Sequence, residues 1–354
     1  MNTDKFKIAF FDAKPYDRAF FNAENEKYDY AITYFESRLT KDSAPLANGF
    51  DAVCAFVNDD IGEEVVDSLV SSGVKILAMR CAGYNNVNLY ASHGRLPVVR
   101  VPAYSPYAVA EHAVALLLTL NRNTHRAYYR VREHNFSING LLGFDLHGKT
   151  AGVIGTGKIG KILMNILLGF GMKVLAYDYY PDEKFAEETG IEYVNLERIY
   201  RESDVISLHC PLTPETRYMI NAESIEIMKR GIYIINTSRG HLIDTSALIE
   251  GLKKGIIGGA GLDVYEEESE YFFEDKSDEL LIDDTLARLT TFNNVLITSH
   301  QAFFTEEALS NIASTTLHNI DDFINGRKLV NGICVNCDGS KPCPGKPCGK
   351  NCPK

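Results

Sequence analysis

Short apolar runs recur along the first part of the chain and are separated by polar, turn-rich or helical segments. The runs at Lys7 to Phe11, Ala52 to Val57, Lys75 to Ala78 and Val98 to Val101 each have the length and composition of a buried strand. Strands that alternate with helices are typical of a parallel sheet. The pattern therefore predicts an α/β domain at the start of the chain.

A second strand series follows a long helix. From Tyr107 to Leu120 the apolar residues recur at helical spacing, which predicts a mostly buried helix. Strand-like runs then return at Lys149–Ile154, Lys173–Tyr177, Val205–Leu208, Tyr233–Asn236, Gly258–Asp263 and Val295–Thr298. Together they predict a doubly wound sheet with helices on both faces.

A further helix closes the periodic part of the chain. Its apolar positions run from Glu306 to Phe323, and Asn325-Gly326 is a typical C-terminal stop. This helix follows the last strand of the second series. The pattern alone leaves open whether the helix packs there or returns to the first domain.

The bulk composition is that of an ordinary globular protein and excludes several classes. The chain has 354 residues, of which 45% are hydrophobic and 23% charged, enough for two domains with separate cores. The net charge of −11 argues against nucleic acid as a partner, since phosphate backbones need clustered Lys and Arg. No apolar run is long enough to cross a membrane, and Met1 to Lys14 lacks the apolar core of a signal peptide, so we expect a cytoplasmic protein.

A glycine-rich turn lies between a predicted strand and a predicted helix. It reads Gly155-Thr156-Gly157-Lys158-Ile159-Gly160. The three glycines permit a tight turn, a close approach of the backbone to a pyrophosphate, and close packing of the helix on the sheet. The next strand ends in Asp178, whose carboxylate would accept both ribose hydroxyls and repel a 2′-phosphate. The turn therefore predicts a site for NAD rather than NADP, and a turn that binds nothing is the weaker explanation.

Three polar stretches follow three of the predicted strands. They are Thr237 to Gly240 with Arg239, Gly261 to Glu268, and Ser299 to Ala302 with His300. Ligands of open α/β sheets bind at the carboxyl ends of the strands, so we expect these side chains in one site. A guanidinium clamps a planar carboxylate with two parallel hydrogen bonds, and a His beside a carboxylate delivers a proton to a ketone. The constellation predicts reduction of a 2-keto acid.

Each of the three residues has a plainer explanation when it is taken alone. Arg239 also fits a surface arginine at a strand end, and Glu268 sits in an acidic run of the kind that is usually solvated. His300 also fits a structural histidine. Their joint occurrence after successive strands favours the catalytic interpretation.

Several motifs give the chain a resemblance to a known family. They are Arg80-Cys81-Ala82-Gly83-Tyr84-Asn85-Asn86, Val101-Pro102-Ala103-Tyr104-Ser105-Pro106, Ala151 to Gly160, Ser207-Leu208-His209-Cys210-Pro211-Leu212-Thr213, Asn236 to Gly240, Asp263 to Glu268, and Ser299-His300-Gln301-Ala302-Phe303. From about Lys7 to about Asn325 the chain resembles the D-isomer-specific 2-hydroxyacid dehydrogenases. Within them it is most similar to the fermentative D-lactate dehydrogenases of the enteric-bacterial type.

The resemblance implies a role for each site residue. Arg239 would bind the substrate carboxylate, His300 would be the general acid in pyruvate reduction and the base in lactate oxidation, and Glu268 would pair with His300. The remaining substrate contacts would come from the amides of Ala82 and Gly83 and from Tyr104, which would help to close the pocket. NAD would be held by the glycine loop and Asp178, by Asp263 at the nicotinamide carboxamide, and by His209, Pro211 and Thr237 along the cofactor cleft.

The resemblance also implies an architecture of two doubly wound parallel-sheet α/β domains. A flavodoxin-like substrate domain would be built from residues 1–101 and 300–330. A Rossmann-type NAD domain, residues 102–299, would be inserted between them, with a cleft between the two domains. Members of the family are usually dimers through the NAD domain, so we expect a homodimer or homotetramer.

Three functions remain to be separated. The first is reversible, NADH-dependent reduction of pyruvate to D-lactate, and Phe303 favours it by giving a small methyl-bearing acid an apolar wall. The second is a dehydrogenase for another small D-2-hydroxy acid. The third, of a different class, is an NAD-sensing binding protein of the corepressor type, which would not need the three catalytic residues.

The last segment, Asn331 to Lys354, has a composition of its own. It holds five of the eight cysteines and too few aliphatic residues for a core, so we expect it to be disordered. Cys334-x-x-Cys337 is half the pattern of a zinc or iron–sulfur site, but no second such pair and no His accompanies it, so a metal site and a flexible tail both remain open. The body holds only Cys54, Cys81 and Cys210, which predicts no disulfide scaffold and a reducing compartment.

Overall fold

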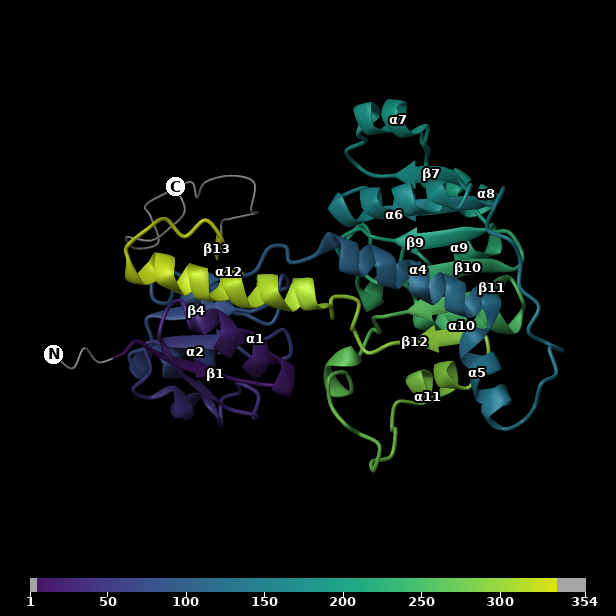
Figure 1. Cartoon of the computed structure of the whole chain (residues 1–354). Coiled ribbons are helices and arrows are strands. Elements are labelled where there is room, and N and C mark those ends of the chain that lie inside the picture. Colours follow the sequence, from purple (N-terminus) through teal and green to yellow (C-terminus); the bar gives the residue numbers. More distant parts are fainter. Residues whose placement is uncertain (1–4, 336–354) are drawn as a thin grey trace. The chain divides into compact units, whose positions relative to one another are not determined.

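Each predicted strand series forms a sheet of its own in the computed structural model, which describes residues 5–335 (Figure 1). One sheet belongs to a unit made of residues 5–105 and 304–335, and the other to a unit made of residues 106–303. The chain leaves the first unit after Ser105 and the second after Phe303, not after 101 and 299 as expected. Residues 102–105 therefore belong to the first unit, and residues 300–303 belong to the second.

The first unit has a six-stranded sheet in the order β13-β5-β4-β3-β1-β2. Its strands are β1 (Lys7–Phe10), β2 (Ala31–Tyr34), β3 (Ala52–Ala55), β4 (Ile76–Met79), β5 (Val98–Val99) and β13 (Gly332–Ile333). Its helices are α1 (Pro15–Asn25), η1 (Ala44–Ala47), α2 (Glu63–Ser71), α3 (Leu89–Ser92) and α12 (Glu306–Ile324). The five parallel strands have the flavodoxin-like order. The C-terminal helix α12 contacts α1 and β4, so it belongs to this unit.

The second unit has a seven-stranded parallel sheet in the order β12-β11-β10-β9-β6-β7-β8. Its strands are β6 (Thr150–Ile154), β7 (Lys173–Tyr177), β8 (Glu192–Tyr193), β9 (Val205–Leu208), β10 (Ile232–Asn236), β11 (Ile257–Leu262) and β12 (Val295–Ile297). Its helices are α4 (Pro106–Arg122), α5 (Thr124–Arg132), α6 (Lys158–Gly169), α7 (Glu183–Thr189), α8 (Leu196–Glu202), α9 (Ala222–Glu226), η2 (Gly240–Leu242), α10 (Thr245–Lys253), η3 (Glu268–Glu270) and α11 (Asp284–Thr290). This is the Rossmann order with one strand added at the β12 edge, which confirms the predicted fold class.

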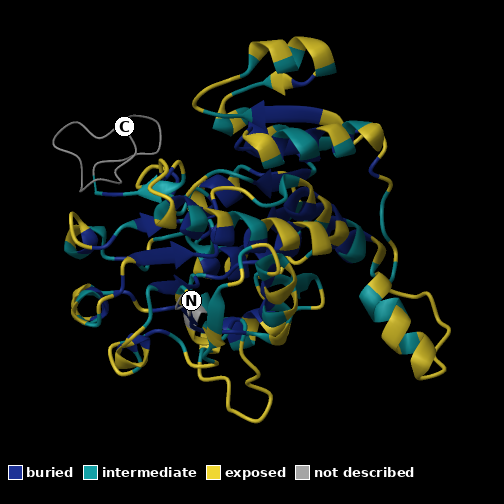
Figure 2. Cartoon of the chain, turned by 60° about the vertical axis from the view of Figure 1, so that its left-hand side comes forward, coloured by how far each residue is buried: buried dark blue, intermediate teal, exposed yellow. Residues whose placement is uncertain are grey.

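Neighbouring side chains of the second sheet pack on its opposite faces. Val153 and Ile235 join a core cluster with residues of α4 and α6, whereas Ile154 and Ile234 join another with residues of α8 and α10. The strands β6, β7, β9, β10 and β11 are accordingly mostly buried, and Figure 2 shows such strands in dark blue and the outer faces of helices in yellow. Each fully buried aliphatic side chain contributes about 1.5–3 kcal/mol. The sheet is therefore a rigid platform for the residues that follow its strands.

The strands β2, β8 and β13 were not predicted. Residues 331–335, which the sequence assigned to a disordered tail, are folded: β13 pairs antiparallel with β5, and Cys334 is buried. Two-residue pairing on an edge strand rests on backbone hydrogen bonds and leaves no mark in the apolar pattern, which explains the error. The other tail cysteines, Cys337, Cys343, Cys348 and Cys352, lie outside the described residues.

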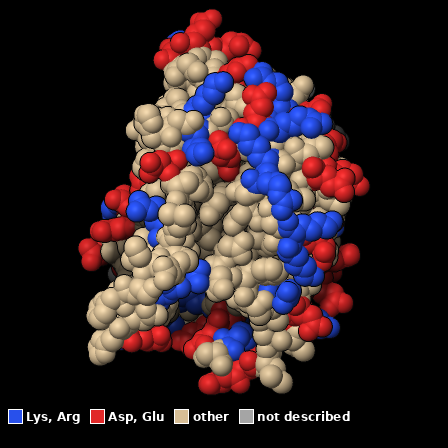
Figure 3. All heavy atoms as spheres, turned by 90° about the vertical axis from the view of Figure 1, so that its right-hand side faces the viewer, with Lys and Arg blue, Asp and Glu red and all other residues tan. Residues whose placement is uncertain are grey.

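The surface carries both charges, although the net charge is −11. Lys and Arg side chains form a line over the face drawn in Figure 3, with Asp and Glu around it. Within residues 5–335, every helix is too short or too polar to cross a bilayer.

Candidate active site

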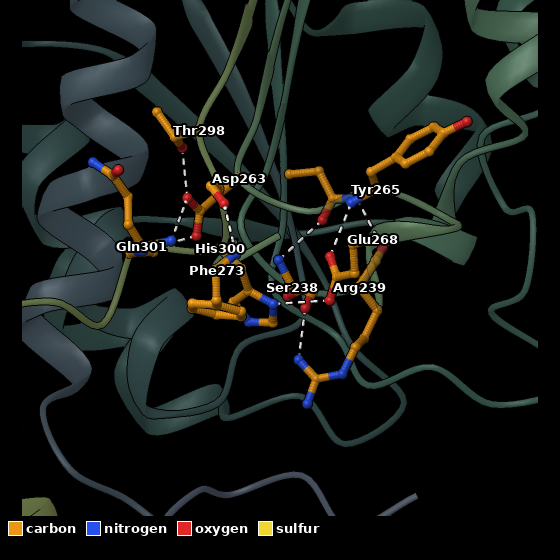
Figure 4. A network of polar contacts seen from close by, with 12 residues as sticks. Ser238, Arg239, Asp263, Tyr265, Glu268, Phe273, Thr298, His300 and Gln301 are labelled. Atoms are coloured by element: carbon orange, nitrogen blue, oxygen red, sulfur yellow. Dashed lines mark hydrogen bonds and ion pairs between the residues drawn. The ribbon is translucent and has the colours of Figure 1, made fainter. Parts of the chain in front are cut away.

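The carboxyl ends of β10, β11 and β12 bring the three predicted catalytic residues into one network (Figure 4). His300 Nδ1 lies 2.8 Å from Glu268 Oε1, and Glu268 Oε2 accepts a hydrogen bond of 3.0 Å from the amide of Tyr265. The carboxylate is thus fixed by its own loop and in turn orients the imidazole. This arrangement leaves Nε2 of the ring for a reacting group.

The guanidinium of Arg239 has no carboxylate partner among residues 5–335, and its side chain is half-buried. Its Nη1 donates to the carbonyl of Ser238 at 2.6 Å. The carbonyl of Arg239 itself accepts from Asn236 Nδ2 at 2.9 Å, which ties the loop to the end of β10. In Figure 4 the guanidinium and the imidazole of His300 extend to the same side of the network. The remaining N–H groups can therefore clamp a carboxylate placed there.

The backbone of His300 is in the left-handed region, with φ at +49°. For a residue with a side chain this conformation costs about 1–2 kcal/mol. Asp263 holds it in place: its carbonyl accepts from the amide of His300 at 2.8 Å, and its carboxylate accepts from the amides of Gln301 and Ala302 at 2.9 and 2.8 Å. Asp263 is completely buried. Besides its predicted cofactor contact, Asp263 therefore stabilises the backbone of the segment that carries His300.

The glycine turn has the shape that a dinucleotide site requires. Gly155 has φ +94°, and a Cβ there would lie 2.5 Å from the amide nitrogen of Cys210. A Cβ on Gly160 would lie 2.1 Å from the carbonyl of Gly155, whereas one on Gly157 would meet nothing within 4 Å. Gly157 also caps α6 without a side chain, so the first amides of the helix, from Lys158 and Ile159 on, face outward for a phosphate.

Asp178 stands beside this turn at the end of β7. Its Oδ2 accepts from the amide and the hydroxyl of Thr156 at 2.6 and 3.1 Å, and its Oδ1 accepts from the amide of Tyr180 at 2.9 Å. The carboxylate is partly exposed, so it retains acceptor capacity for a ribose. The residues of the turn and Asp178 therefore fit a dinucleotide.

Two of the other predicted cofactor residues carry buried polar atoms without a partner. Among the described residues, neither Nδ1 of His209 nor Oγ1 of Thr237 has a hydrogen-bond partner. Such atoms are rare in native structures, and a bound cofactor is one source of the missing partner. Burial lowers the pKa of His209 to about 4, so its ring is neutral at physiological pH. Pro211, on the loop after β9, is exposed.

Ala82, Gly83 and Tyr104 lie in the first unit. Ala82 and Gly83 follow β4, next to a buried arginine: Arg80 donates to the carbonyls of Phe11 and Asp12 at 3.0 and 2.7 Å. The carbonyl of Ala82 accepts from Arg100 Nη1 at 2.7 Å. These contacts fix the backbone of the loop that carries the two predicted substrate amides.

The sequence analysis missed two polar residues of the network. Thr298 Oγ1 lies 2.5 Å from Asp263 Oδ1, and His112 Nε2 lies 3.0 Å from Thr298 Oγ1. His112 interrupts the apolar pattern of α4, which is a signal that the sequence does contain. Thr298 is the last residue of a predicted strand. Threonine is common in strands, so the sequence gives no signal for its role.

A Rossmann-type sheet with this glycine turn, and a His–carboxylate pair beside an arginine, define a nicotinamide-dependent dehydrogenase. Comparison with known families agrees. The sequence model of the NAD-binding domain of the D-isomer specific 2-hydroxyacid dehydrogenases matches residues 114–302. The chain belongs to this family, as its motifs predicted.

Known relatives match almost the whole chain. D-lactate dehydrogenase from Escherichia coli is 52% identical over 92% of this chain and 99% of that protein. Its apo-structure has a TM-score of 0.86 at 50% identity, with the same coverage of the two chains, 92% and 99%.

Two further solved structures are similar. The pyruvate reductase of Chlamydomonas reinhardtii has a TM-score of 0.88 at 44% identity, covering 92% of this chain and 98% of that one. D-lactate dehydrogenase from Lactobacillus jensenii, solved with NAD⁺, has a TM-score of 0.78 at 31% identity, covering 92% of this chain and 99% of that one. The predicted family, fold and cofactor, NAD, are thus confirmed.

Proposed function

We propose that this protein reduces pyruvate to D-lactate with NADH and catalyses the reverse oxidation. The observation that carries the proposal is the His300–Glu268 pair, with 2.8 Å between Nδ1 and Oε1, beside the uncompensated guanidinium of Arg239. A 2-keto acid offers a carboxylate for the arginine and a ketone for the histidine. Similarity to proteins named D-lactate dehydrogenase and pyruvate reductase supports pyruvate as the acid.

The geometry supports a role for each of the three residues. NADH, when bound, supplies the hydride, and NAD⁺ accepts it in the reverse direction. Arg239 holds the substrate carboxylate through two parallel hydrogen bonds and so orients the ketone. His300 gives its Nε2 proton to the ketone oxygen while Nδ1–H stays bonded to Glu268. The negative charge of Glu268 stabilises the charged ring before the transfer, and the neutral ring takes the hydroxyl proton in lactate oxidation.

The supporting residues keep their predicted roles in this proposal. The amides of Ala82 and Gly83 bind the substrate carboxylate, and Tyr104 helps to close the pocket. The turn Gly155 to Gly160 binds the pyrophosphate, and Asp178 binds the ribose. The remaining cofactor contacts are those of Asp263 with the carboxamide and of His209, Pro211 and Thr237 along the cofactor.

The surroundings of His300 favour a small apolar substituent on the acid. The ring centroid of Phe273 lies 5.9 Å from that of His300 and 6.5 Å from that of Phe303. Phe303 is buried, and neither phenyl ring has a polar atom to offer a substrate. A methyl group suits such a wall better than a hydroxyl or a second charge.

We also propose that the protein is a cytoplasmic homodimer or homotetramer. Large apolar side chains on and after α5 are highly exposed, among them Tyr129 at 67%, Phe136 at 71%, Ile138 at 82% and Leu142 at 94%. An apolar surface of this kind supports contact with a second copy of the chain. Cys54 and Cys210 are free thiols, which suits a reducing compartment.

A panel of 2-keto acids separates the candidate functions. NADH consumption is followed with pyruvate, with branched and longer 2-keto acids, and without acid. The proposal predicts the highest kcat/KM for pyruvate. A higher value for a branched or longer acid would assign the protein to another 2-hydroxy acid. Tight NADH binding without turnover of any acid would favour the binding protein of the corepressor type.

A further inference from the structure

We propose that His112 and Thr298 are positioning residues for the proposed dehydrogenase reaction. They complete a hydrogen-bond chain that fixes the backbone of His300 through the buried carboxylate of Asp263. The inference rests on the proposed function for its kinetic test, and on the contacts of residues 106–303 for its structural basis.

Asp263 is the anchor of the segment that carries His300. Its carboxylate receives three hydrogen bonds from that segment: from the hydroxyl of Thr298 at 2.5 Å and from the amides of Gln301 and Ala302 at 2.9 and 2.8 Å (Figure 4). A fully buried carboxylate is stable only when donors of this kind compensate for lost hydration. Two of the three donors are backbone amides. The hydroxyl of Thr298 is therefore the one donor of the three that a side-chain substitution can remove.

The hydrogen bonds that link His112, Thr298 and Asp263 run in one direction, because the carboxylate of Asp263 can only accept. Thr298 has one hydroxyl proton, and at 2.5 Å that proton belongs to the bond with Asp263 Oδ1. The contact of 3.0 Å between Thr298 Oγ1 and His112 Nε2 therefore needs a proton on the histidine. His112 Nε2 also lies 3.4 Å from Asp263 Oδ1. The structure thus assigns the Nε2–H tautomer to His112.

His112 links this anchor to a different element. It lies on α4, which contacts β10, β11 and β12, and its side chain is 18% exposed. The helix starts at Pro106, where the chain enters the second unit, and Ala302 stands next to the point where the chain leaves it. The chain of hydrogen bonds therefore joins the first helix of this unit to its last segment, and His300 lies on that segment.

The consequence for the reaction is geometric. His300 combines a left-handed backbone with a ring whose Nδ1 lies 2.8 Å from Glu268 and whose Nε2 gives the proton in the proposed reaction. Without the hydroxyl or the imidazole donor, the segment can relax toward ordinary backbone angles. Small displacements of a catalytic group cost up to about a hundredfold in rate. Among the described residues, the glycine turn, which binds the pyrophosphate in the proposed function, has no hydrogen bond to residues 298–302.

The first test compares two substitutions of Thr298. Thr298→Val keeps the shape and removes the hydroxyl, whereas Thr298→Ser keeps the donor. We expect the valine variant to lose roughly ten- to hundredfold in kcat, and the serine variant to stay within about threefold of the wild type. The Kd of NADH, measured by fluorescence without substrate, should change much less than kcat in the valine variant, because the proposed pyrophosphate and ribose contacts at Gly155 to Gly160 and Asp178 are unaltered. A valine variant with wild-type kcat would overturn the proposal.

The second test applies the same logic to His112, which tolerates substitution better because it is partly exposed. His112→Gln places an amide N–H near the position of Nε2, whereas His112→Leu offers no donor. We expect the leucine variant to lose kcat and the glutamine variant to recover most of it. Equal losses in both variants, or none in either, would reduce His112 to a packing residue. If Thr298→Val fails to fold, this pair decides the question.

A measurement without turnover separates this inference from the proposed function. Nitrogen NMR of the histidine-labelled protein at alkaline pH, with His112 assigned from the His112→Gln spectrum, reports which ring nitrogen carries the proton. We expect Nε2–H, protected from exchange. A proton on Nδ1 would refute the hydrogen-bond chain even in an enzyme that is active on pyruvate. An Nε2–H ring in a protein that is inactive on every 2-keto acid would refute the proposed function instead.

Discussion

At the scale of single residues, the proposed chemistry depends on three side chains, each fixed by a different neighbour. Glu268 is held by the amide of Tyr265, and His300 is held by Glu268 and by the backbone around Asp263. Arg239 makes its only described polar side-chain contact with the carbonyl of Ser238. The arginine is therefore the residue with most capacity left for a substrate.

Arg239→Lys should lose most activity although the positive charge remains. A lysine is a point donor and cannot form the planar clamp of two bonds. The loss of transition-state stabilisation, about 3–4 kcal/mol, corresponds to a fall of roughly two to three decades in kcat/KM for pyruvate. Arg201→Lys, on the exposed face of α8, is the matched control. Near wild-type turnover of the Arg239 variant would remove this residue from the site.

Glu268→Gln should lower kcat for pyruvate reduction by roughly ten- to hundredfold. The carboxylate accepts from Nδ1 of His300 and compensates the positive charge of the ring that donates the proton, whereas a neutral amide does not. The exposed neighbour supplies the control, Glu267→Gln, which should stay within about threefold of the wild type. Wild-type kcat in the Glu268 variant would make this residue part of the solvated acidic run.

At the scale of elements, apolar runs and glycines were more informative than single polar residues. The strands of both sheets and the glycine turn could be predicted because burial and close packing restrict the residue types that fit. The left-handed backbone of His300 and the contacts of Thr298 with Asp263 could not. They arise only when β11 and β12 lie side by side, and nothing local in the sequence encodes that pairing.

The turn between β6 and α6 leads to a prediction about cofactor choice. Asp178→Ser combined with Tyr179→Arg should shift preference from NADH toward NADPH, because the carboxylate at the end of β7 would no longer repel a 2′-phosphate. The ratio of kcat/KM values for the two cofactors measures the shift. Tyr179→Arg alone, which keeps the carboxylate, is the control. An unchanged ratio in the double variant would show that Asp178 does not face the ribose.

At the scale of the whole molecule, the chain builds two units from three segments. The composition and the apolar pattern predicted both sheets, but they left the place of the C-terminal helix open, and the family resemblance assigned it to the first unit. In the structure α12 contacts α1 and β4 there, and Tyr30 donates to Asp321 on α12 at 3.1 Å. Such long-range pairs are invisible in a sequence read locally.

The end of the first unit gives a prediction about truncation. Removal of residues 336–354 should leave pyruvate reduction unchanged, because the site residues precede them. Removal of residues 331–354 should lower the melting temperature, since it deletes β13 and the hydrogen bond of 2.8 Å from Asn331 Nδ2 to Asn319. Equal melting temperatures would show that β13 adds nothing to stability. Zinc or iron in the full-length protein, absent after the shorter truncation, would reveal a metal site in the tail.

The central claim, stereospecific reduction of pyruvate by the His300–Glu268 pair and Arg239, is tested most directly by the configuration of the product. Pyruvate and NADH are converted by the full-length protein, and the lactate is resolved on a chiral column against NADH consumed. The account predicts one D-lactate for each NADH, and no product from His300→Ala. L-lactate, or no lactate while NADH binds, would contradict it.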